Sequence, residues 1–209
     1  MKIAVFGATG RAGQHLVEQA LAAGQEVVAL VRTPAKLKIS DARLSVIQGD
    51  VQDSAKVEQT IAGVDGVVSV LGPASNAPTF EISKGMQHIL AAMSKHGVQR
   101  LVISAGAGVG DPNDAPKLIH KAINALLKLL AGNVYEDMKR TVATVRASDR
   151  DWVIVRVPRL TDDPKSGKLQ VGYVGKGMGM QIGRADMTDF MLKQLASDTY
   201  LRKAPAISN

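Results

Sequence analysis

The chain has no cysteine, few aromatic residues and no long apolar run. Without cysteine it can form no disulfide framework and carry out no thiol chemistry. No stretch approaches the roughly 20 apolar residues that a membrane helix needs. Met1 and Lys2 lead into a short apolar run that glycine ends at once, which is unlike a secretory signal. These absences predict a globular, cytoplasmic protein without a membrane partner.

The charge is basic, but its distribution does not favour nucleic acid. There are 26 lysines and arginines against 19 acidic residues, which gives a formal charge of +7. Nucleic-acid-binding proteins usually carry a basic run or aromatic side chains on which bases stack. Here the basic residues are dispersed, and aromatic residues make up 3% of the chain. We therefore expect a small molecule, and not nucleic acid, as the partner.

Short, β-branched apolar runs alternate with helical stretches along most of the chain. Such runs are typical of strands buried on both faces of a parallel sheet, and their alternation with helices predicts right-handed βαβ units. The predicted fold class is therefore α/β, with a Rossmann-type doubly wound parallel sheet. The expected strands are 2–6, 26–31, 44–48, 66–71, 100–104 and 152–157, and the expected helices are 13–23, 53–62, 79–96, 115–131, 135–148 and 186–197.

The length and the lack of a low-complexity linker predict one domain over residues 1–209. After Pro158 the pattern loosens into a polar turn, a strand-like stretch at 168–174 and a glycine-rich segment. Residues 159–209 are expected to form a small extension over the acceptor site and to contribute to its substrate side. Asp186 is placed to cap the last helix.

Residues 7–13, GATGRAG, follow the first expected strand and open the first expected helix. In that context a glycine-rich turn binds the diphosphate of a dinucleotide. One glycine allows the tight turn, one lets the diphosphate approach the backbone, and one lets helix and strand pack closely. Backbone N–H groups at the helix start favour the anion. The predicted cofactor contacts of this turn are Gly7, Thr9, Gly10, Arg11, Ala12 and Gly13.

The end of the second strand selects between two dinucleotides. Turns that bind NAD usually have a carboxylate about 20 residues further on, which binds the ribose 2′-hydroxyl. This chain has Arg32 there, with Lys36 just beyond. Because a guanidinium can bind a 2′-phosphate that a carboxylate would repel, we predict NADP(H) as the cofactor.

Two further strand ends carry candidate cofactor contacts. Asp50 and Val51 follow the third strand, where Asp50 either reaches the adenine amino group, with Val51 against the ring, or caps the next helix. Gly72 ends the fourth strand, where it either lets the nicotinamide ribose approach or forms a turn with Pro73.

Candidate catalytic residues are few, because hydride transfer asks the protein mainly to align donor and acceptor and sometimes to supply a proton. Ser104 is expected to end the fifth strand, where its hydroxyl orients nicotinamide or acceptor, or bonds the following turn. Tyr135 and Lys139 match Y-x-x-x-K, and are either an acid/base pair or a helix-start tyrosine with a solvated lysine. The four histidines lack metal-ligand spacing, so we expect no metal.

Several segments together resemble a known family. GATGRAG, VRTPAKL, VLGPAS and VRVPRLTDDPKSG are similar to segments of the atypical short-chain dehydrogenases/reductases, in particular the flavin reductase/biliverdin-IXβ reductase branch. The resemblance implies a Rossmann-type sheet, NADPH and hydride transfer to a flat conjugated acceptor. It also implies cofactor contacts for Leu71, Ser104, Val157 and Pro158.

The resemblance departs from the family pattern at the acceptor side. That branch has a histidine after the proline that follows the sixth strand, and this chain has Arg159 there. Arginine does not release its proton at ordinary pH, so it cannot serve as a general acid. It can clamp a carboxylate or phosphate of the acceptor, and we therefore count Arg159 among the candidate catalytic residues.

The sequence thus predicts an NADPH-dependent oxidoreductase that transfers hydride to a flavin, quinone or similar conjugated acceptor, as a monomer or weak homodimer. Two other functions stay open, namely a regulatory protein that senses NADP(H) without turnover and a nucleotide-sugar epimerase or dehydratase. Residues 115–131 form a basic amphipathic stretch, for which we consider a core or lid position, a dimer face, or a membrane surface.

Overall fold

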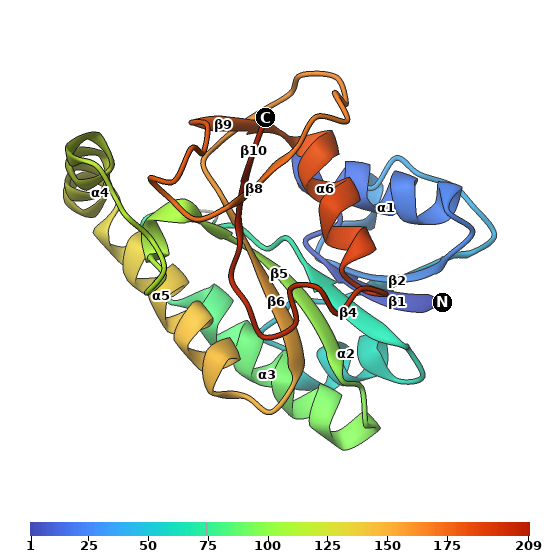
Figure 1. The fold of residues 1–209 in the computed structure, drawn as a ribbon. Coiled ribbons are helices and arrows are strands. Elements are labelled where there is room, and N and C mark those ends of the chain that lie inside the picture. The colour runs from blue at the N-terminus through green and yellow to red at the C-terminus, as the bar shows by residue number, and fades with distance from the viewer. Residues whose placement is uncertain (74) are drawn as a thin grey trace.

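An eight-stranded sheet forms the centre of the computed structural model, which describes residues 1–73 and 75–209 (Figure 1). Its strand order is β3-β2-β1-β4-β5-β6-β10-β8, with β8 antiparallel to β10 and the other neighbours parallel. The order reverses between β1 and β4, as in a doubly wound sheet. The strands are β1 (Lys2–Phe6), β2 (Glu26–Val31), β3 (Leu44–Gln48), β4 (Gly66–Ser69), β5 (Arg100–Gly106), β6 (Asp151–Val157), β8 (Gln170–Gly172) and β10 (Ala206–Ser208). The predicted Rossmann-type α/β fold is confirmed.

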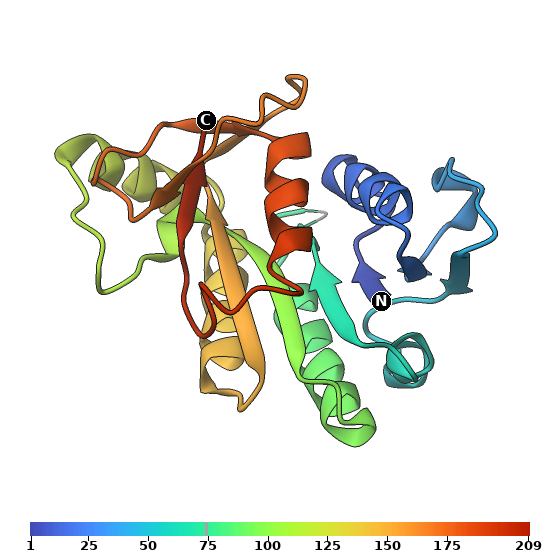
Figure 2. The same cartoon turned by 45° about the vertical axis from the view of Figure 1, so that its right-hand side comes forward.

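Helices cover both faces of this sheet (Figure 2). On one face, α1 and α6 bury apolar side chains such as Leu16 and Met191. On the other face, α2, α3 and α5 bury side chains such as Ile89 and Val145. Because both faces are covered, the inner strands are mostly apolar, as the sequence pattern predicts. The helices are α1 (Arg11–Ala22), α2 (Ser54–Ile61), α3 (Glu81–His96), α4 (Leu118–Leu130), α5 (Gly132–Ala147) and α6 (Arg184–Lys193), with short 3₁₀ turns η1 (Pro34–Lys36) and η2 (Ala107–Val109).

The C-terminal part adds short strands that the sequence does not predict. β7 (Arg159–Thr161) and β9 (Gln181–Gly183) form a separate two-stranded parallel sheet. β10 lies against β6, and β8 closes that edge of the main sheet in place of the longer strand expected at 168–174. β7, β9 and β10 were not predicted, because strands of three residues are too short to show an alternating apolar pattern.

Helix α6 begins two residues earlier than predicted, at Arg184, and Gly183 is its N-cap. The expectation that Asp186 caps this helix is therefore wrong. Its buried carboxylate instead accepts hydrogen bonds from the backbone N–H groups of Ser166 and Gly167, both at 3.0 Å. Burial alone would raise the pKa of Asp186, but these hydrogen bonds outweigh it and lower that pKa below its ordinary value. Asp186 thus attaches the segment after β7 to α6.

Helix α4 lies at the periphery, beyond the edge of the sheet (Figures 1 and 2). It continues directly into α5, because Ala131 is the C-cap of one helix and the N-cap of the other. None of its residues, 118–130, is buried. A position for this helix in the core, one of the options that the sequence left open, is therefore wrong.

Candidate cofactor and acceptor sites

A cavity of about 530 Å³ lies at the carboxyl ends of the strands on both sides of the β1–β4 switch. Open α/β sheets bind their ligands at this point, and the volume is within the range of small-molecule sites. The turns that follow β1, β2, β3 and β4 all contribute to the wall. The predicted cofactor residues that line it are Gly7, Thr9, Gly10, Arg11, Ala12, Gly13, Arg32, Lys36, Asp50, Val51, Leu71 and Gly72.

Two glycines of the first turn have no room for a side chain. Gly7 has a φ of +90°, and a Cβ there would lie 2.9 Å from the carbonyl carbon of Val70, just after β4. A Cβ on Gly13 would collide with the carbonyl oxygen of Gly7, so α1 packs against the turn only because that atom is absent. At Gly10 a Cβ would meet the same oxygen at an ordinary 3.4 Å.

Gly10 is also the extended N-cap of α1, and no side chain caps the helix there. The first N–H groups of α1 are therefore available to an anion at the cavity wall, and the helix dipole favours that anion. The glycine turn fits the diphosphate of a dinucleotide.

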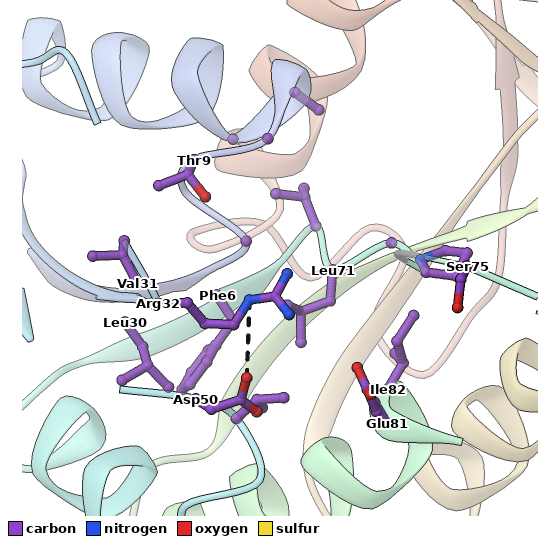
Figure 3. Close-up of a pocket in the computed structure, with 18 of the residues that line it drawn as sticks. Phe6, Thr9, Leu30, Val31, Arg32, Asp50, Leu71, Ser75, Glu81 and Ile82 are labelled. Atoms are coloured by element: carbon purple, nitrogen blue, oxygen red, sulfur yellow. Dashed lines mark ion pairs between the residues drawn. The ribbon is translucent and has the colours of Figure 1, made fainter. Parts of the chain in front are cut away.

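Arg32 reaches from the end of β2 across this cavity. In Figure 3 its side chain extends toward Leu71, and Asp50 lies beside it. The Arg32 Nε is 3.9 Å from Oδ2 of Asp50, an ion pair longer than a hydrogen bond. Asp53, and not Asp50, caps α2 with its side chain, which removes the capping role that the sequence left open for Asp50. Lys36, at the end of η1, lines the same cavity.

A carboxylate that the sequence analysis did not single out links the glycine turn to α6. Asp162 accepts hydrogen bonds from Arg11 at 3.1 Å and from Arg184 at 2.6 Å. Arg184 is the first residue of α6, is buried, and lines the cofactor cavity. Sequence reasoning missed this cation because it follows an irregular glycine-rich segment and belongs to no motif.

The opposite wall of the cofactor cavity comes from α3, α5 and the segment before α3. Buried Asp137 of α5 accepts hydrogen bonds from the backbone N–H groups of Ile82 at 3.1 Å and Ser83 at 2.9 Å. One helix thus caps the other and fixes this wall. Asp137 lies within YEDMK, between the tyrosine and the lysine of the Y-x-x-x-K match, at a position that this motif leaves undefined. The residues of this wall that the sequence did not predict are Ser75, Ala77, Thr79, Glu81, Ile82, Asn133, Val134 and Asp137.

A second cavity, of about 780 Å³, lies beyond the ends of β5 and β6. Most of the side chains that line it are apolar, including those of Met138, Met178 and Met180, with a few polar groups such as His120 and Asn124. A mostly apolar cavity with a small number of polar groups is typical of sites for small organic molecules.

The predicted catalytic residues divide between this second cavity and positions outside it. Tyr135 and Arg159 line the cavity, as do Val157 and Pro158, which the resemblance had placed at the cofactor. The Tyr135 hydroxyl donates a hydrogen bond to the Gly108 carbonyl oxygen at 3.1 Å. The Arg159 guanidinium donates to the side chain of Gln181 at 3.1 Å.

Ser104 and Lys139 line neither of these two cavities. The expectation that Ser104 ends the fifth strand is wrong, because β5 continues to Gly106 and leaves Ser104 within the strand. The Lys139 ammonium lies 6.0 Å from the centre of the Tyr135 ring and 3.9 Å from the Glu136 carboxylate. The Lys139 ammonium thus lies near the Glu136 carboxylate and the face of the Tyr135 ring, while the Tyr135 hydroxyl bonds to Gly108.

The first turns of α5 separate the two cavities. Asn133, Val134 and Asp137 line the cofactor cavity, whereas Tyr135 and Met138 line the second one. Neighbouring residues of these turns thus contribute to the walls of both cavities.

A buried ion pair frames the second cavity. Arg156 of β6 is fully buried and binds the Asp114 carboxylate through two hydrogen bonds, of 2.7 and 2.9 Å. Asp114 also accepts the Val174 N–H at 2.9 Å. Burial alone would raise the pKa of Asp114, but the hydrogen bonds and charge of Arg156 outweigh it and lower that pKa below its ordinary value.

Comparison with known proteins shows the family of the chain. A sequence model described as NAD(P)H-binding matches residues 7–198, which is most of the chain. The chain belongs to the NAD(P)H-binding family. The cofactor predicted from the glycine turn is therefore confirmed at the level of NAD(P)H.

Relatives of known name include both reductases and epimerases. Cinnamoyl-CoA reductase 1 of Oryza sativa is 30% identical over 151 residues, 66% of this chain and 43% of the rice protein. UDP-glucose 4-epimerase of Lacticaseibacillus casei is 33% identical over 128 residues, 56% of this chain and 39% of the epimerase. The chain thus spans less than half of the length of these two relatives.

A solved structure supports the fold over the whole chain. A short-chain dehydrogenase/reductase of Veillonella parvula, in complex with NADP, matches with a TM-score of 0.81. The two sequences are 20% identical, and the match covers 100% of this chain and 94% of the other. In the described residues, no helix is long and apolar enough to cross a membrane, and no cluster of three metal-ligand side chains occurs.

Proposed function

We propose that this NAD(P)H-binding protein is an NADPH-dependent reductase of a conjugated small molecule, such as a flavin or a quinone. The observation that carries the proposal is the pair of neighbouring cavities, to both of which the first turns of α5 contribute. The first cavity, here the cofactor cavity, has the diphosphate turn and several cations. The second cavity, here the acceptor cavity, is mostly apolar. This arrangement suits a dinucleotide beside a flat organic acceptor.

The choice of NADPH over NADH rests on the end of β2. Arg32 and Lys36 line the cofactor cavity there, where the sequence motif for NAD has a carboxylate. Asp50 lies 3.9 Å from Nε of Arg32, and the terminal N–H groups of the Arg32 guanidinium can bind a 2′-phosphate. The 2′-phosphate is the group that distinguishes the two dinucleotides.

When bound, NADPH supplies a hydride, so the acceptor gains a hydride and a proton while NADP⁺ is formed. The chain contributes by positioning the acceptor and excluding water. We assign the Tyr135 hydroxyl to hydrogen bonding with the acceptor, in exchange for its present partner, the Gly108 carbonyl. We assign Arg159 to a carbonyl oxygen of the acceptor, because it lines the cavity and its guanidinium always carries N–H donors. Lys139 and Ser104 have no contact role in this scheme.

The direct test is oxidation of NADPH by the purified protein with FMN, riboflavin and a panel of quinones. Ile123→Trp should obstruct the second cavity, which Ile123 lines, and lower kcat/KM for the acceptor on the order of tenfold. NADPH affinity, measured by calorimetry, should not change. Ile119→Trp is the matched control, because Ile119 belongs to the same helix but not to the cavity lining.

The alternatives are separated by this assay together with calorimetry of NADPH binding and an assay for nucleotide-sugar epimerisation. Binding of NADPH without turnover of any acceptor would favour a protein that senses NADP(H). Interconversion of nucleotide-sugar epimers would favour the activity named for the Lacticaseibacillus relative, although Lys139 lies outside the acceptor cavity here. If the protein binds neither NADPH nor NADP⁺, the reductase and the sensor are both refuted.

A further inference from the structure

Helix α4 presents its most apolar side chains to solvent. Leu118 is 83% exposed and Leu129 is 81% exposed, and Ile119, Leu126 and Leu130 are also exposed. The side that faces the protein carries His120, Asn124 and Leu127, which line the acceptor cavity at spacings of four and three residues. A helix that packed to fill the core would have the opposite orientation. The leucine face of α4, defined by Leu118, Ile119, Leu126, Leu129 and Leu130, therefore suits contact with something outside the chain.

The charges on α4 are all of one sign. Lys117, Lys121 and Lys128 are spaced by four and seven residues, so they lie along one flank of the helix. Between Asp114 and Glu136 the sequence contains no acidic residue. The partner that fits this helix is thus apolar where it meets the leucines and anionic where it meets the lysines.

A lipid surface has both properties, and a second copy of the chain has only one. Pairing two α4 helices would bury leucines, but it would also bring together lysines of both copies with no carboxylate in this segment to face them. An anionic bilayer offers acyl chains at the level of the leucines and headgroup charge at the level of the lysines. With 13 residues, α4 is about 20 Å long, which suits a helix lying in the interface and not one that spans a core of about 30 Å.

The leucine face is continuous with the mouth of the acceptor cavity. Ile123, Leu127 and Met180 line the cavity, and they remain 37%, 46% and 48% exposed. A surface that covered the leucine face would therefore also border the entrance to the cavity. A lipid-dissolved molecule could pass from that surface into the cavity without crossing water.

We propose that α4 docks the protein on an anionic phospholipid surface and opens the acceptor cavity toward the lipid. This inference rests on the proposed reductase function. The acceptor is then a conjugated compound with a long apolar tail, such as a lipid-soluble quinone. The sequence predicts no membrane partner, but it leaves a membrane surface among the positions considered for residues 115–131, and the exposed leucine face favours that position.

The test is cosedimentation of the full chain with phospholipid vesicles. We expect at least about tenfold more protein to sediment with vesicles that contain phosphatidylglycerol than with phosphatidylcholine alone, and high salt to release it. The double variant Leu118→Gln/Leu129→Gln should stay in the supernatant, and Lys117→Gln/Lys121→Gln should lose the preference for phosphatidylglycerol. Val46→Gln, at an exposed apolar residue of β3, and Lys38→Gln/Lys168→Gln, at exposed lysines elsewhere, are the matched controls.

Folding of each variant is checked by its NADPH affinity, which should equal that of the parent protein. The docking proposal is overturned if the parent protein does not sediment with anionic vesicles. It is equally overturned if the same fraction of Leu118→Gln/Leu129→Gln sediments as of the parent. It is also overturned if the parent is a dimer that this variant dissociates and neither protein binds vesicles, because α4 would then join two copies.

The acceptor class is tested with a long-tailed quinone dissolved in the vesicles and a short, water-soluble quinone. The Leu118→Gln/Leu129→Gln variant should reduce the vesicle-dissolved quinone at least about tenfold more slowly than the parent and the soluble one at the same rate. Equal rates of the variant and the parent with both quinones would overturn the lipid-dissolved acceptor. Vesicle binding without NADPH oxidation by any quinone would refute the reductase function and leave the docking surface intact.

Discussion

The contribution of Arg32 to cofactor choice is a property of one side chain. Arg32→Asp should weaken NADPH binding by about 1–3 kcal/mol, because a charge-assisted hydrogen bond to the 2′-phosphate is lost, and should leave NADH binding unchanged. Calorimetry with both dinucleotides measures the two affinities. Lys168→Asp, at an exposed residue outside the cavity, makes the same change of charge and should affect neither. Unchanged NADPH affinity in Arg32→Asp would remove the argument for NADP(H) over NAD(H).

Tyr135 and Lys139 should behave as separate residues and not as a pair. Tyr135 lines the acceptor cavity, whereas Lys139 lies outside it beside Glu136. If the tyrosine supplies a proton or orients the acceptor, Tyr135→Phe lowers kcat on the order of 100-fold with NADPH affinity unchanged. Lys139→Met should retain nearly full kcat. Equal losses in the two variants, measured at saturating NADPH, would show that they do form an acid/base pair.

At the residue scale, the sequence predicted the cofactor wall well and the acceptor wall poorly. The glycine turn and Arg32 follow strands whose ends were correctly located, so their side of the cavity could be inferred from the chain order. Ser104 was misplaced because β5 runs two residues further than expected, to Gly106. Arg184 and Asp137 reach the cofactor cavity from helices that are distant in sequence, and no local pattern marks them.

At the scale of the element, two glycines near the start of α1 should have different roles. Gly13 allows α1 to pack against the glycine turn, and Gly10 allows the diphosphate to approach the backbone. Gly13→Ala places a Cβ against the Gly7 carbonyl oxygen, so it should lower the free energy of unfolding by about 1–3 kcal/mol and the urea midpoint by about 1 M. Gly10→Ala has ordinary room and should keep the urea midpoint nearly unchanged. Because its methyl group lies where the diphosphate approaches the backbone, Gly10→Ala should weaken NADPH binding at least about tenfold, or 1.4 kcal/mol.

Urea unfolding and calorimetry on the same samples distinguish these outcomes. A Gly10→Ala protein that binds NADPH normally would show that the diphosphate does not approach this backbone. A Gly13→Ala protein of parental stability would contradict the close packing of α1 on the turn.

At the element scale, the length of a strand or helix decided whether the sequence could predict it. Strands of five or more residues and helices of three or more turns were located within a few residues of their observed ends. β7, β9 and β10 have three residues each, which is too few for a periodic signal, whereas β8 occupies the middle of the longer strand predicted at 168–174. The periodicity of α4 indicated an apolar face correctly but could not say which way that face points, and the structure turns much of it toward solvent.

At the scale of the whole molecule, residues far apart in sequence hold the C-terminal part against the sheet. Arg156 and Asp114 are separated by 42 residues, and the bond from Val174 to Asp114 spans 60. Neither link could be read from the sequence, because an isolated Asp and Arg are usually solvated surface residues. Their pairing appears only once β6 is buried and the loop before α4 folds over its end.

This ion pair should make the stability of the protein depend on pH in a defined direction. Asp114→Asn leaves Arg156 buried without its charge partner, and at neutral pH it should lower the free energy of unfolding by about 3–5 kcal/mol. The pKa of Asp114 is lowered in the folded protein from an ordinary value of 3.8, so its stabilising effect is complete above that value. It is lost as the pH falls through the folded-state pKa, because protonation then removes the same charge that the variant lacks.

Urea unfolding of the parent and of Asp114→Asn between pH 7 and pH 3 should therefore give two curves that run parallel above about pH 4 and converge below it. Asp41→Asn is the control, because Asp41 pairs with Arg43 at the surface and an exposed pair contributes little to stability. A constant difference down to pH 3 would mean that Asp114→Asn destabilises the protein through the shape or the hydrogen bonds of the new side chain alone. A difference that grows as the pH falls would have the wrong sign for a carboxylate whose pKa is lowered by folding, and would contradict the ionised pair.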